Sequence, residues 1–253
     1  MGFPPGREVV YSVAGRRGPV LRRTGSTEMK QIPARPAVAP ARIKPRLRGV
    51  SHQYAFFVSL ITGLLLVVSA PTARAAVAAG TFAASLTLLL GVSALYHRVT
   101  WTPRARFWMA RLDLAMIFVL IAGTYTPIAL LALKGTLATV VLVGIWALAV
   151  LGTVLKVFWT DPPKWASACV YVAVGSVGVL FIPQVVSAVG GTGATLLGVG
   201  GLLYIAGALT YGLQRPDPVP TVFGYHEVFH ALVIAAAAFH YLAVAIYVVP
   251  IAA

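Results

Sequence analysis

The sequence has little charge and very few acidic residues. Only 10% of its 253 residues are charged and only 6 are Asp or Glu, whereas 59% are hydrophobic. The mean hydropathy is +0.86. A soluble domain carries roughly 25% charged residues, because its surface must face water. This composition excludes a soluble enzyme and a disordered chain, and it predicts a polytopic membrane protein.

A single cysteine, Cys169, excludes an internal disulfide and therefore a disulfide scaffold. Because Cys169 lies in an apolar stretch, we expect it to be a small buried side chain. The sequence also lacks a GxxxxGK[ST] phosphate loop. We therefore interpret glycines in the apolar stretches, such as Gly152, Gly175 and Gly198, as positions where helices pack closely.

Basic residues gather near the N-terminus, and they account for much of the formal net charge of +14. Eleven of the 20 Lys and Arg precede Ser51, together with seven of the 17 prolines. This pattern predicts a disordered basic tail over residues 1–50 and a membrane domain over residues 51–253. We expect the tail to contact anionic lipid headgroups on the cytoplasmic side, and we expect no nucleic-acid partner.

Seven apolar stretches follow the tail, each close to the ~20 residues that cross ~30 Å of hydrocarbon. Backbone groups within a bilayer must be satisfied inside the segment, so each stretch is expected to be a helix. The sequence thus predicts an all-α bundle of seven transmembrane helices in a cell membrane. The predicted spans are 52–69, 76–97, 112–133, 136–157, 166–187, 193–213 and 224–250.

The loops differ in basic residues, which sets the expected orientation. With the N-terminus inside, 18 Lys and Arg lie on the cytoplasmic side and only Arg74 and Lys134 lie outside. The positive-inside rule therefore predicts a cytoplasmic N-terminus and an external C-terminus.

Five polar residues converge at one depth in this arrangement. Ser93 and His97 share one helix face at the end of the second span, and His226 and His230 share one at the start of the seventh. Asp113 begins the third span. All five are expected just inside the cytoplasmic boundary, facing the bundle interior. Three imidazoles and a carboxylate are what a catalytic zinc site requires, with a fourth coordination position open to water.

Other histidines and Glu227 receive different interpretations. His240 lies ~18 Å deeper than the midpoint of His226 and His230, so we expect a core histidine bonded to a neighbouring span. His52 is expected at the membrane interface. His226 to His230 also matches HExxH, which raises an intramembrane metalloprotease as an alternative. No acid follows Glu227 to supply the usual third ligand, so Glu227 is interpreted as a neighbour of the ligands or an interfacial charge.

Three motifs resemble those of the haemolysin III family, the bacterial branch of the progestin and adiponectin receptor (PAQR) proteins. The motifs are Ser93-Ala94-Leu95-Tyr96-His97, Asp113 in Arg-Leu-Asp, and Gly-Tyr-His-Glu-Val-Phe-His at 224–230. The resemblance covers roughly residues 50–253. It implies a seven-helix fold in a bacterial cell membrane, with a cytoplasmic N-terminus.

The same resemblance implies zinc held by His97, His226 and His230, with Asp113 contacting it through water and Ser93 nearby. It also implies hydrolysis of lipid amides, as in the related alkaline ceramidases. Glu227 stands where the receptor branch has an amide, which leaves the substrate open.

The leading hypothesis is zinc-dependent hydrolysis of a membrane lipid amide, with Asp113 as general base. Tyr125, Tyr204 and Tyr211 either line the lipid cavity or simply pack. Two alternatives stay open: a membrane-perturbing pore protein, and a receptor-like regulator of membrane lipid state with structural zinc.

Overall fold

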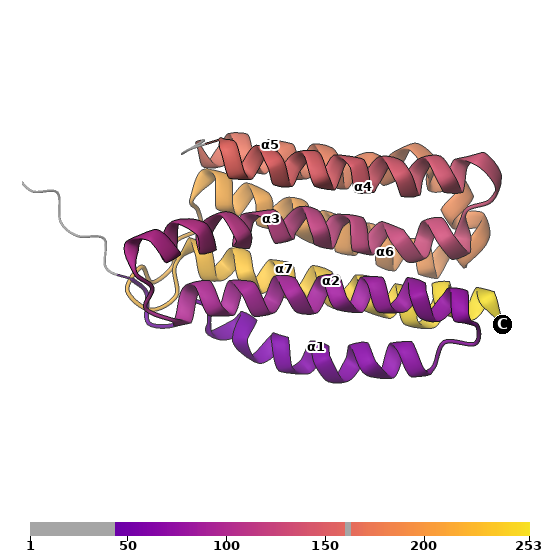
Figure 1. Cartoon of the computed structure of the whole chain (residues 1–253), viewed down its shortest axis with the longest axis horizontal. Helices are drawn as coiled ribbons and strands as arrows, with labels where there is room; N and C mark the ends of the chain where they lie inside the picture. The colour runs from indigo at the N-terminus through magenta and orange to yellow at the C-terminus, as the bar shows by residue number, and fades with distance from the viewer. Residues whose placement is uncertain (1–43, 160–162) are drawn as a thin grey trace, which may run out of the picture. The chain divides into compact units, whose positions relative to one another are not determined.

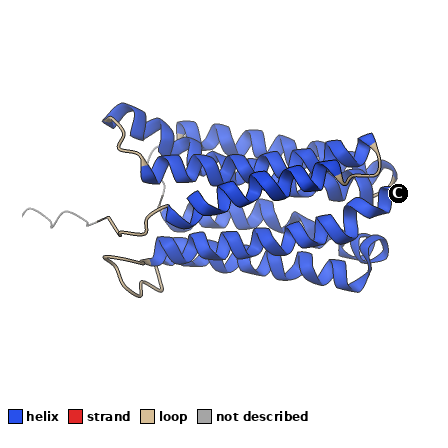
Figure 2. Ribbon diagram, turned by 90° about the horizontal axis from the view of Figure 1, so that it is seen from below, coloured by secondary structure: helices blue, strands red, loops and turns tan. Residues whose placement is uncertain are grey.

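The chain is helical along almost all of the part that the structure describes. The structure is a computed structural model, and it describes residues 44–159 and 163–253. Figure 2 shows helices joined by loops in this part, and one isolated antiparallel bridge joins Val219 and Phe223. The prediction of an all-α protein is confirmed. The α-helices are α1 (Val50–Val68), α2 (Ala73–Arg98), α3 (Pro103–Pro127), α4 (Gly135–Phe158), α5 (Lys164–Gly175), α6 (Ile182–Leu213) and α7 (Tyr225–Ala243).

Short irregular turns extend three of these helices. A π-helical turn, Ile128–Ala132, continues α3, and a 3-10 segment, Ser176–Phe181, joins α5 to α6. A second π-helical turn and a last 3-10 turn, Val244–Val248 and Val249–Ala252, follow α7. Among the described residues, six helical segments are long and apolar enough to cross a membrane.

One of these six segments, Lys164–Leu213, is 50 residues long. A straight helix of that length would measure about 75 Å, more than twice the hydrocarbon thickness of ~30 Å. The segment instead breaks at Gly190, where φ is 73° and ψ is 172°. The two legs lie against each other, as the positions of Gly212 and Ala168 show: a Cβ at Gly212 would lie 3.3 Å from the Cβ of Ala168. Its two legs hold the predicted fifth and sixth spans, while the count of seven crossings and the orientation stay predictions.

Helix α3 begins nine residues earlier than the sequence pattern predicted. Thr102 caps it by accepting a hydrogen bond from the backbone N–H of Ala105 at 3.4 Å, and Pro103 occupies the first turn. Both are helix-start signals. The prediction was wrong because it followed hydrophobicity alone, and these first turns carry Arg104 and Arg106. They extend α3 beyond the apolar span.

Small residues mark close packing at some positions and open space at others. At Gly152 in α4, an added Cβ would lie 2.5 Å from the ring of Phe118, so the missing side chain admits that ring. The packing prediction is wrong for Gly175 and Gly198, because nothing lies within 4 Å of a Cβ there. Cys169 is exposed on α5, so the expectation that it is buried is also wrong.

The start of α1, the end of α2 and the starts of α3, α5 and α7 lie at one end of the bundle, on the left of Figure 1. We call it the histidine end. Backbone N–H groups of Arg46 and Leu47 donate to the carbonyls of Thr221 and Val222, at 3.0 and 3.1 Å. Gly49 has φ 78°, and a Cβ there would lie 2.5 Å from the Cβ of His97. A glycine thus lets the segment before α1 lie against α2.

Most of the predicted tail, residues 1–43, lies outside the residues that the structure describes. Its expected contact with anionic lipid therefore stays a prediction. Residues 44–49 are described and are hydrogen-bonded at the histidine end, as noted above. The division of the chain at residue 50 stays a prediction as well.

Candidate metal centre

Three histidines from two helices converge at the histidine end. His97 lies in the last turn of α2, and His226 and His230 lie one turn apart at the start of α7. One ring nitrogen from each lies within 4.8 Å of the others. The Nε2 atoms of His97 and His226 are 3.1 Å apart. The structure thus brings together the three predicted ligands, although His97 lies 129 residues before His226 in the sequence.

The donor set fits a transition-metal ion. Nitrogen ligands at ~2.0–2.1 Å from a tetrahedral zinc lie about 3.3 Å from one another. The His97–His226 separation of 3.1 Å is close to that value, and the widest separation of 4.8 Å is larger, so binding would draw the rings together. The Nδ1 atom of His230 is buried without a hydrogen-bond partner in the described part of the chain. These three histidines lie close enough to hold a metal ion.

Asp113 and Ser93 lie beside the histidines, as the sequence predicted. The Oδ2 atom of Asp113 is 3.7 Å from the Nε2 atom of His97. Ser93, one turn before His97, is buried and lies next to the Asp113 carboxyl group. All five predicted residues line one cavity. A carboxyl group therefore stands next to the donor set without being part of it.

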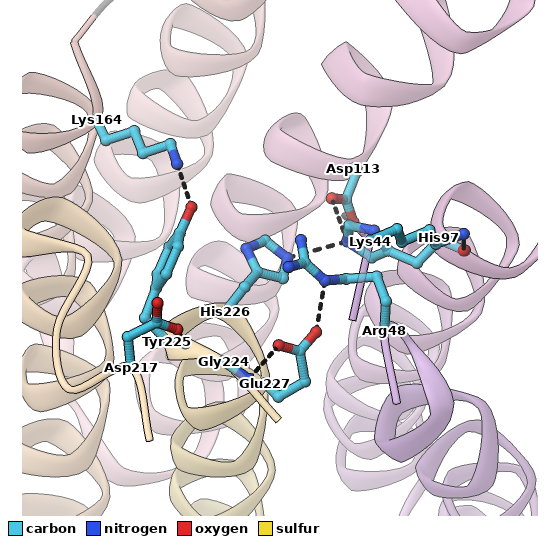
Figure 3. Close-up of polar contacts among 10 residues, drawn as sticks. All are labelled: Lys44, Arg48, His97, Asp113, Lys164, Asp217, Gly224, Tyr225, His226 and Glu227. Atoms are coloured by element: carbon cyan, nitrogen blue, oxygen red, sulfur yellow. Dashed lines mark hydrogen bonds and ion pairs between the residues drawn. The ribbon is translucent and has the colours of Figure 1, made fainter. Parts of the chain in front are cut away.

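Glu227 is buried, which contradicts one of its two interpretations. It is 2% exposed, and its carboxylate accepts hydrogen bonds from the Arg48 guanidinium at 2.5 Å and the Gly224 backbone N–H at 2.9 Å. Figure 3 shows it beneath Arg48, which lies close to His226. The interpretation as an interfacial charge is wrong. The carboxylate stabilises the start of α7 and ties it to the segment before α1.

His52 is the residue at this site that sequence reasoning missed. Its ring stacks on that of His230 with centroids 3.8 Å apart and 7° between planes, and it is 2% exposed. Neither of its ring nitrogens has a hydrogen-bond partner among the described residues. The prediction of an interfacial side chain is wrong because the turn at Gly49 directs the start of α1 against α7. No local pattern around His52 signals this contact.

His240 lies apart from the cluster, as predicted. Its Nε2 atom donates a hydrogen bond to the carbonyl of Leu197 in α6 at 3.0 Å. The interpretation as a core histidine bonded to a neighbouring helix is confirmed. His240 is therefore a buried histidine on α7 that lies outside the candidate metal centre.

A cavity of about 700 Å³ runs from the histidine cluster toward His240. Volumes of this size are typical of small-molecule sites. Most of its wall is apolar, including Leu89, Ile117 and Val233. The three tyrosines considered above, Tyr125, Tyr204 and Tyr211, all line it, which favours the cavity-lining interpretation.

Comparison with known proteins agrees with this architecture. A family model described as Haemolysin-III related matches residues 41–241, which include every residue of the candidate metal centre. The chain belongs to the haemolysin III family. It is similar to the Hemolysin-3 homolog of Bacillus subtilis (strain 168), with 33% identity over 67% of this chain and 76% of that protein. It is also similar to Hemolysin-3 of Bacillus cereus, with 32% identity over 80% of this chain and 91% of that protein.

Membership of the haemolysin III family and the six apolar segments make this chain a multi-pass cell membrane protein. The family match begins at residue 41, so it includes Lys44, Arg48 and His52 as well as the helices. These residues of the histidine end therefore belong to the family domain.

Proposed function

We propose that this haemolysin III family member is a zinc-dependent hydrolase that cleaves an amide bond of a membrane lipid near the cytoplasmic surface. The observation that carries the proposal is the Asp113 carboxyl group, 3.7 Å from a three-histidine cluster at one end of a largely apolar cavity. A base beside a metal site, together with room for an acyl chain, is the arrangement that lipid hydrolysis requires.

His97, His226 and His230 would hold the ion. Three imidazoles with an open fourth position are a donor set used by catalytic zinc sites. Zinc bound there would supply Lewis-acid chemistry, which polarises a carbonyl group and makes water nucleophilic at neutral pH. The same donor set also binds other first-row metals, so metal analysis has to identify the ion.

Asp113 would act as the general base. Its carboxylate accepts a proton from the attacking water and passes that proton to the leaving amine, so the lipid amide and water become a carboxylic acid and an amine. Ser93 lies beside the carboxyl group and would orient it. Glu227 is not assigned this role, because its carboxylate already accepts hydrogen bonds from Arg48 and Gly224.

The cavity would hold the acyl chain of the lipid. Its apolar wall extends from the cluster to Tyr204 and His240, and His240 lies ~18 Å deeper than the midpoint of His226 and His230. Gly198 and Gly201 line the same wall, and a Cβ at either would meet nothing within 4 Å. An acyl chain in this position would place the amide bond of the lipid beside Asp113, because that bond joins the acyl chain to the headgroup side of the molecule.

The test is a hydrolysis screen of lipid amides and lipid esters with purified, zinc-loaded protein. The matched control is the double variant His226→Ala/His230→Ala, and Asp217→Asn, a change at an exposed side chain that does not line the cavity, serves as a second control. We expect release of fatty acid from an amide substrate by the wild type and by Asp217→Asn only. Equal release by the double variant, or no release from any lipid, would contradict the proposal.

A further inference from the structure

Four cationic side chains line the cavity at the histidine end. They come from three separate parts of the chain: the segment before α1, the start of α3 and the start of α5. The four residues are Lys44, Arg48, Arg106 and Lys164. Asp113 is the one acidic residue that lines this cavity in the described part of the chain. The mouth of an otherwise apolar cavity is therefore strongly basic.

Most of this positive charge is not balanced by carboxylates among the described residues. Arg48 pairs with Glu227. Lys44 donates to the backbone carbonyl of His97, and Lys164 donates to the hydroxyl group of Tyr225. The guanidinium carbon of Arg106 lies 5.4 Å from the centre of the Tyr96 ring. Figure 3 shows Lys44, Arg48 and Lys164 around His97, His226 and Tyr225.

The four cationic side chains line one cavity beside a single acidic residue of the described part of the chain, Asp113. Like charges gathered at one mouth repel one another, so an anion bound among them would be stabilised. The Arg106 guanidinium makes no side-chain hydrogen bond to another described residue, and its N–H groups are suited to pair with a bound oxyanion.

We propose that Lys44, Arg48, Arg106 and Lys164 form a subsite for a phosphate group, carried by the headgroup of the lipid whose acyl chain occupies the cavity. Guanidinium and ammonium groups bind phosphate oxygens through charge-assisted hydrogen bonds, and arginine does so with two parallel bonds. This inference rests on the proposed function for the acyl chain in the cavity. It makes the substrate class an N-acylated lipid with a phosphate, rather than a neutral ceramide.

Basic residues at one end of a membrane protein also have a role in topology, and the two roles make different predictions. Arg104 and Arg106 lie two residues apart in the first turns of α3, and both are exposed. Arg106 lines the cavity, whereas Arg104 does not. If these basic residues act only in topology or at the surface, substituting Arg104 or Arg106 should have the same effect on lipid binding. If they form a phosphate subsite, only the substitution of Arg106 should weaken binding.

The experiment measures equilibrium binding of two fluorescent lipids to the purified full-length protein in neutral detergent. The probes are a phosphatidic acid and a ceramide with the same labelled acyl chain. We expect the wild type to prefer the phosphatidic acid. Arg106→Gln should weaken phosphatidic acid binding about tenfold, because one charge-assisted hydrogen bond is lost. The same variant should leave ceramide binding unchanged. Arg104→Gln should change neither affinity.

Arg106→Lys keeps the charge and should restore most of the affinity, and thermal unfolding checks that each variant is folded. Competition by millimolar inorganic phosphate would show that the subsite also takes the free ion. No competition would show that it requires a lipid-borne phosphate, and either result supports the subsite. Equal affinity of the wild type for the two lipids, or equal losses in Arg104→Gln and Arg106→Gln, would overturn it.

The same assay separates this inference from the proposed hydrolysis. Protein stripped of metal by a chelator should still bind the phosphatidic acid, and Arg106→Gln should still weaken that binding. If that binding is found and no lipid is hydrolysed, the proposed function fails and the phosphate subsite stands. If an uncharged lipid amide is hydrolysed and the protein binds the phosphatidic acid no more tightly than the ceramide, the proposed function stands and the subsite fails.

Discussion

The imidazole ring of His52 lies flat against that of His230, with centroids 3.8 Å apart and an angle of 7° between the planes. This stack joins the start of α1 to the start of α7 at the candidate metal centre. Because His52 is buried, it fixes one face of the His230 ring. Residues that orient a metal ligand in this way influence metal affinity although they do not bind the ion.

Removing the ring of His52 should therefore weaken metal binding. We expect His52→Ala to lower zinc affinity by about 10- to 100-fold, the usual effect of losing an orienting neighbour. His52→Phe keeps an aromatic ring at the same place and should lose much less. Chelator competition measures both. If His52→Phe loses as much as His52→Ala, the ring nitrogens matter and the stacking explanation is wrong.

The ion pair between Arg48 and Glu227 should contribute to stability. Glu227→Ala leaves the Arg48 guanidinium and the Gly224 N–H without their shared acceptor. We expect a loss of about 2–3 kcal/mol in the free energy of unfolding, less than for a fully buried pair because Arg48 is partly exposed. Denaturation in detergent measures this loss.

Glu227→Gln separates stability from catalysis, because an amide oxygen still accepts the Gly224 N–H. We expect this variant to keep its metal and most of its hydrolytic activity. A fall in turnover as large as that of an Asp113 variant would instead make Glu227 a catalytic base, as the HExxH pattern implies.

Asp113→Asn tests the proposed base. The amide occupies the same volume but does not accept a proton, so turnover of a lipid amide should fall about 10²- to 10⁴-fold while metal content is unchanged. Asp217→Asn is the matched control, because Asp217 is exposed and its carboxylate accepts a hydrogen bond from the Tyr225 N–H, which an amide oxygen also accepts. Full turnover by Asp113→Asn, with the metal retained, would exclude this role.

Neighbouring glycines of α6 should respond differently to alanine. At Gly200, a Cβ would lie 2.2 Å from the ring of His240, whereas at Gly198 it would meet nothing within 4 Å. We expect Gly200→Ala to cost about 1–3 kcal/mol through overpacking and Gly198→Ala to be nearly neutral. Thermal unfolding of the two variants compares them directly. Similar melting temperatures would show that His240 adapts to the added methyl group.

The helices and the histidine cluster were predictable because their signals are local. Apolar runs of about 20 residues give helices in a membrane. The four-residue spacings of Ser93 with His97 and of His226 with His230 place each pair on one face. Once the helices alternate in direction, the end of α2 and the starts of α3 and α7 must meet at one level. The break at Gly190 likewise falls in the gap between the predicted spans 166–187 and 193–213.

The errors share a different physical origin. A side chain that faces lipid is as apolar as one that faces another helix, so hydrophobicity does not reveal which face is packed. This explains why Cys169 was expected to be buried. Gly198 was assigned to packing because hydrophobicity does not reveal the cavity that this glycine lines. The burial of His52 and the Arg48–Glu227 pair depend on the backbone direction at Gly49, and single residues around them do not specify it.

The measurement that tests the account most directly is the metal content of the purified protein, determined by elemental analysis after gentle purification. The account predicts one zinc ion per chain in the wild type and in His240→Gln. It predicts none in His226→Ala/His230→Ala. A folded wild-type protein without any transition metal, or a double variant that retains zinc at the wild-type level, would contradict it.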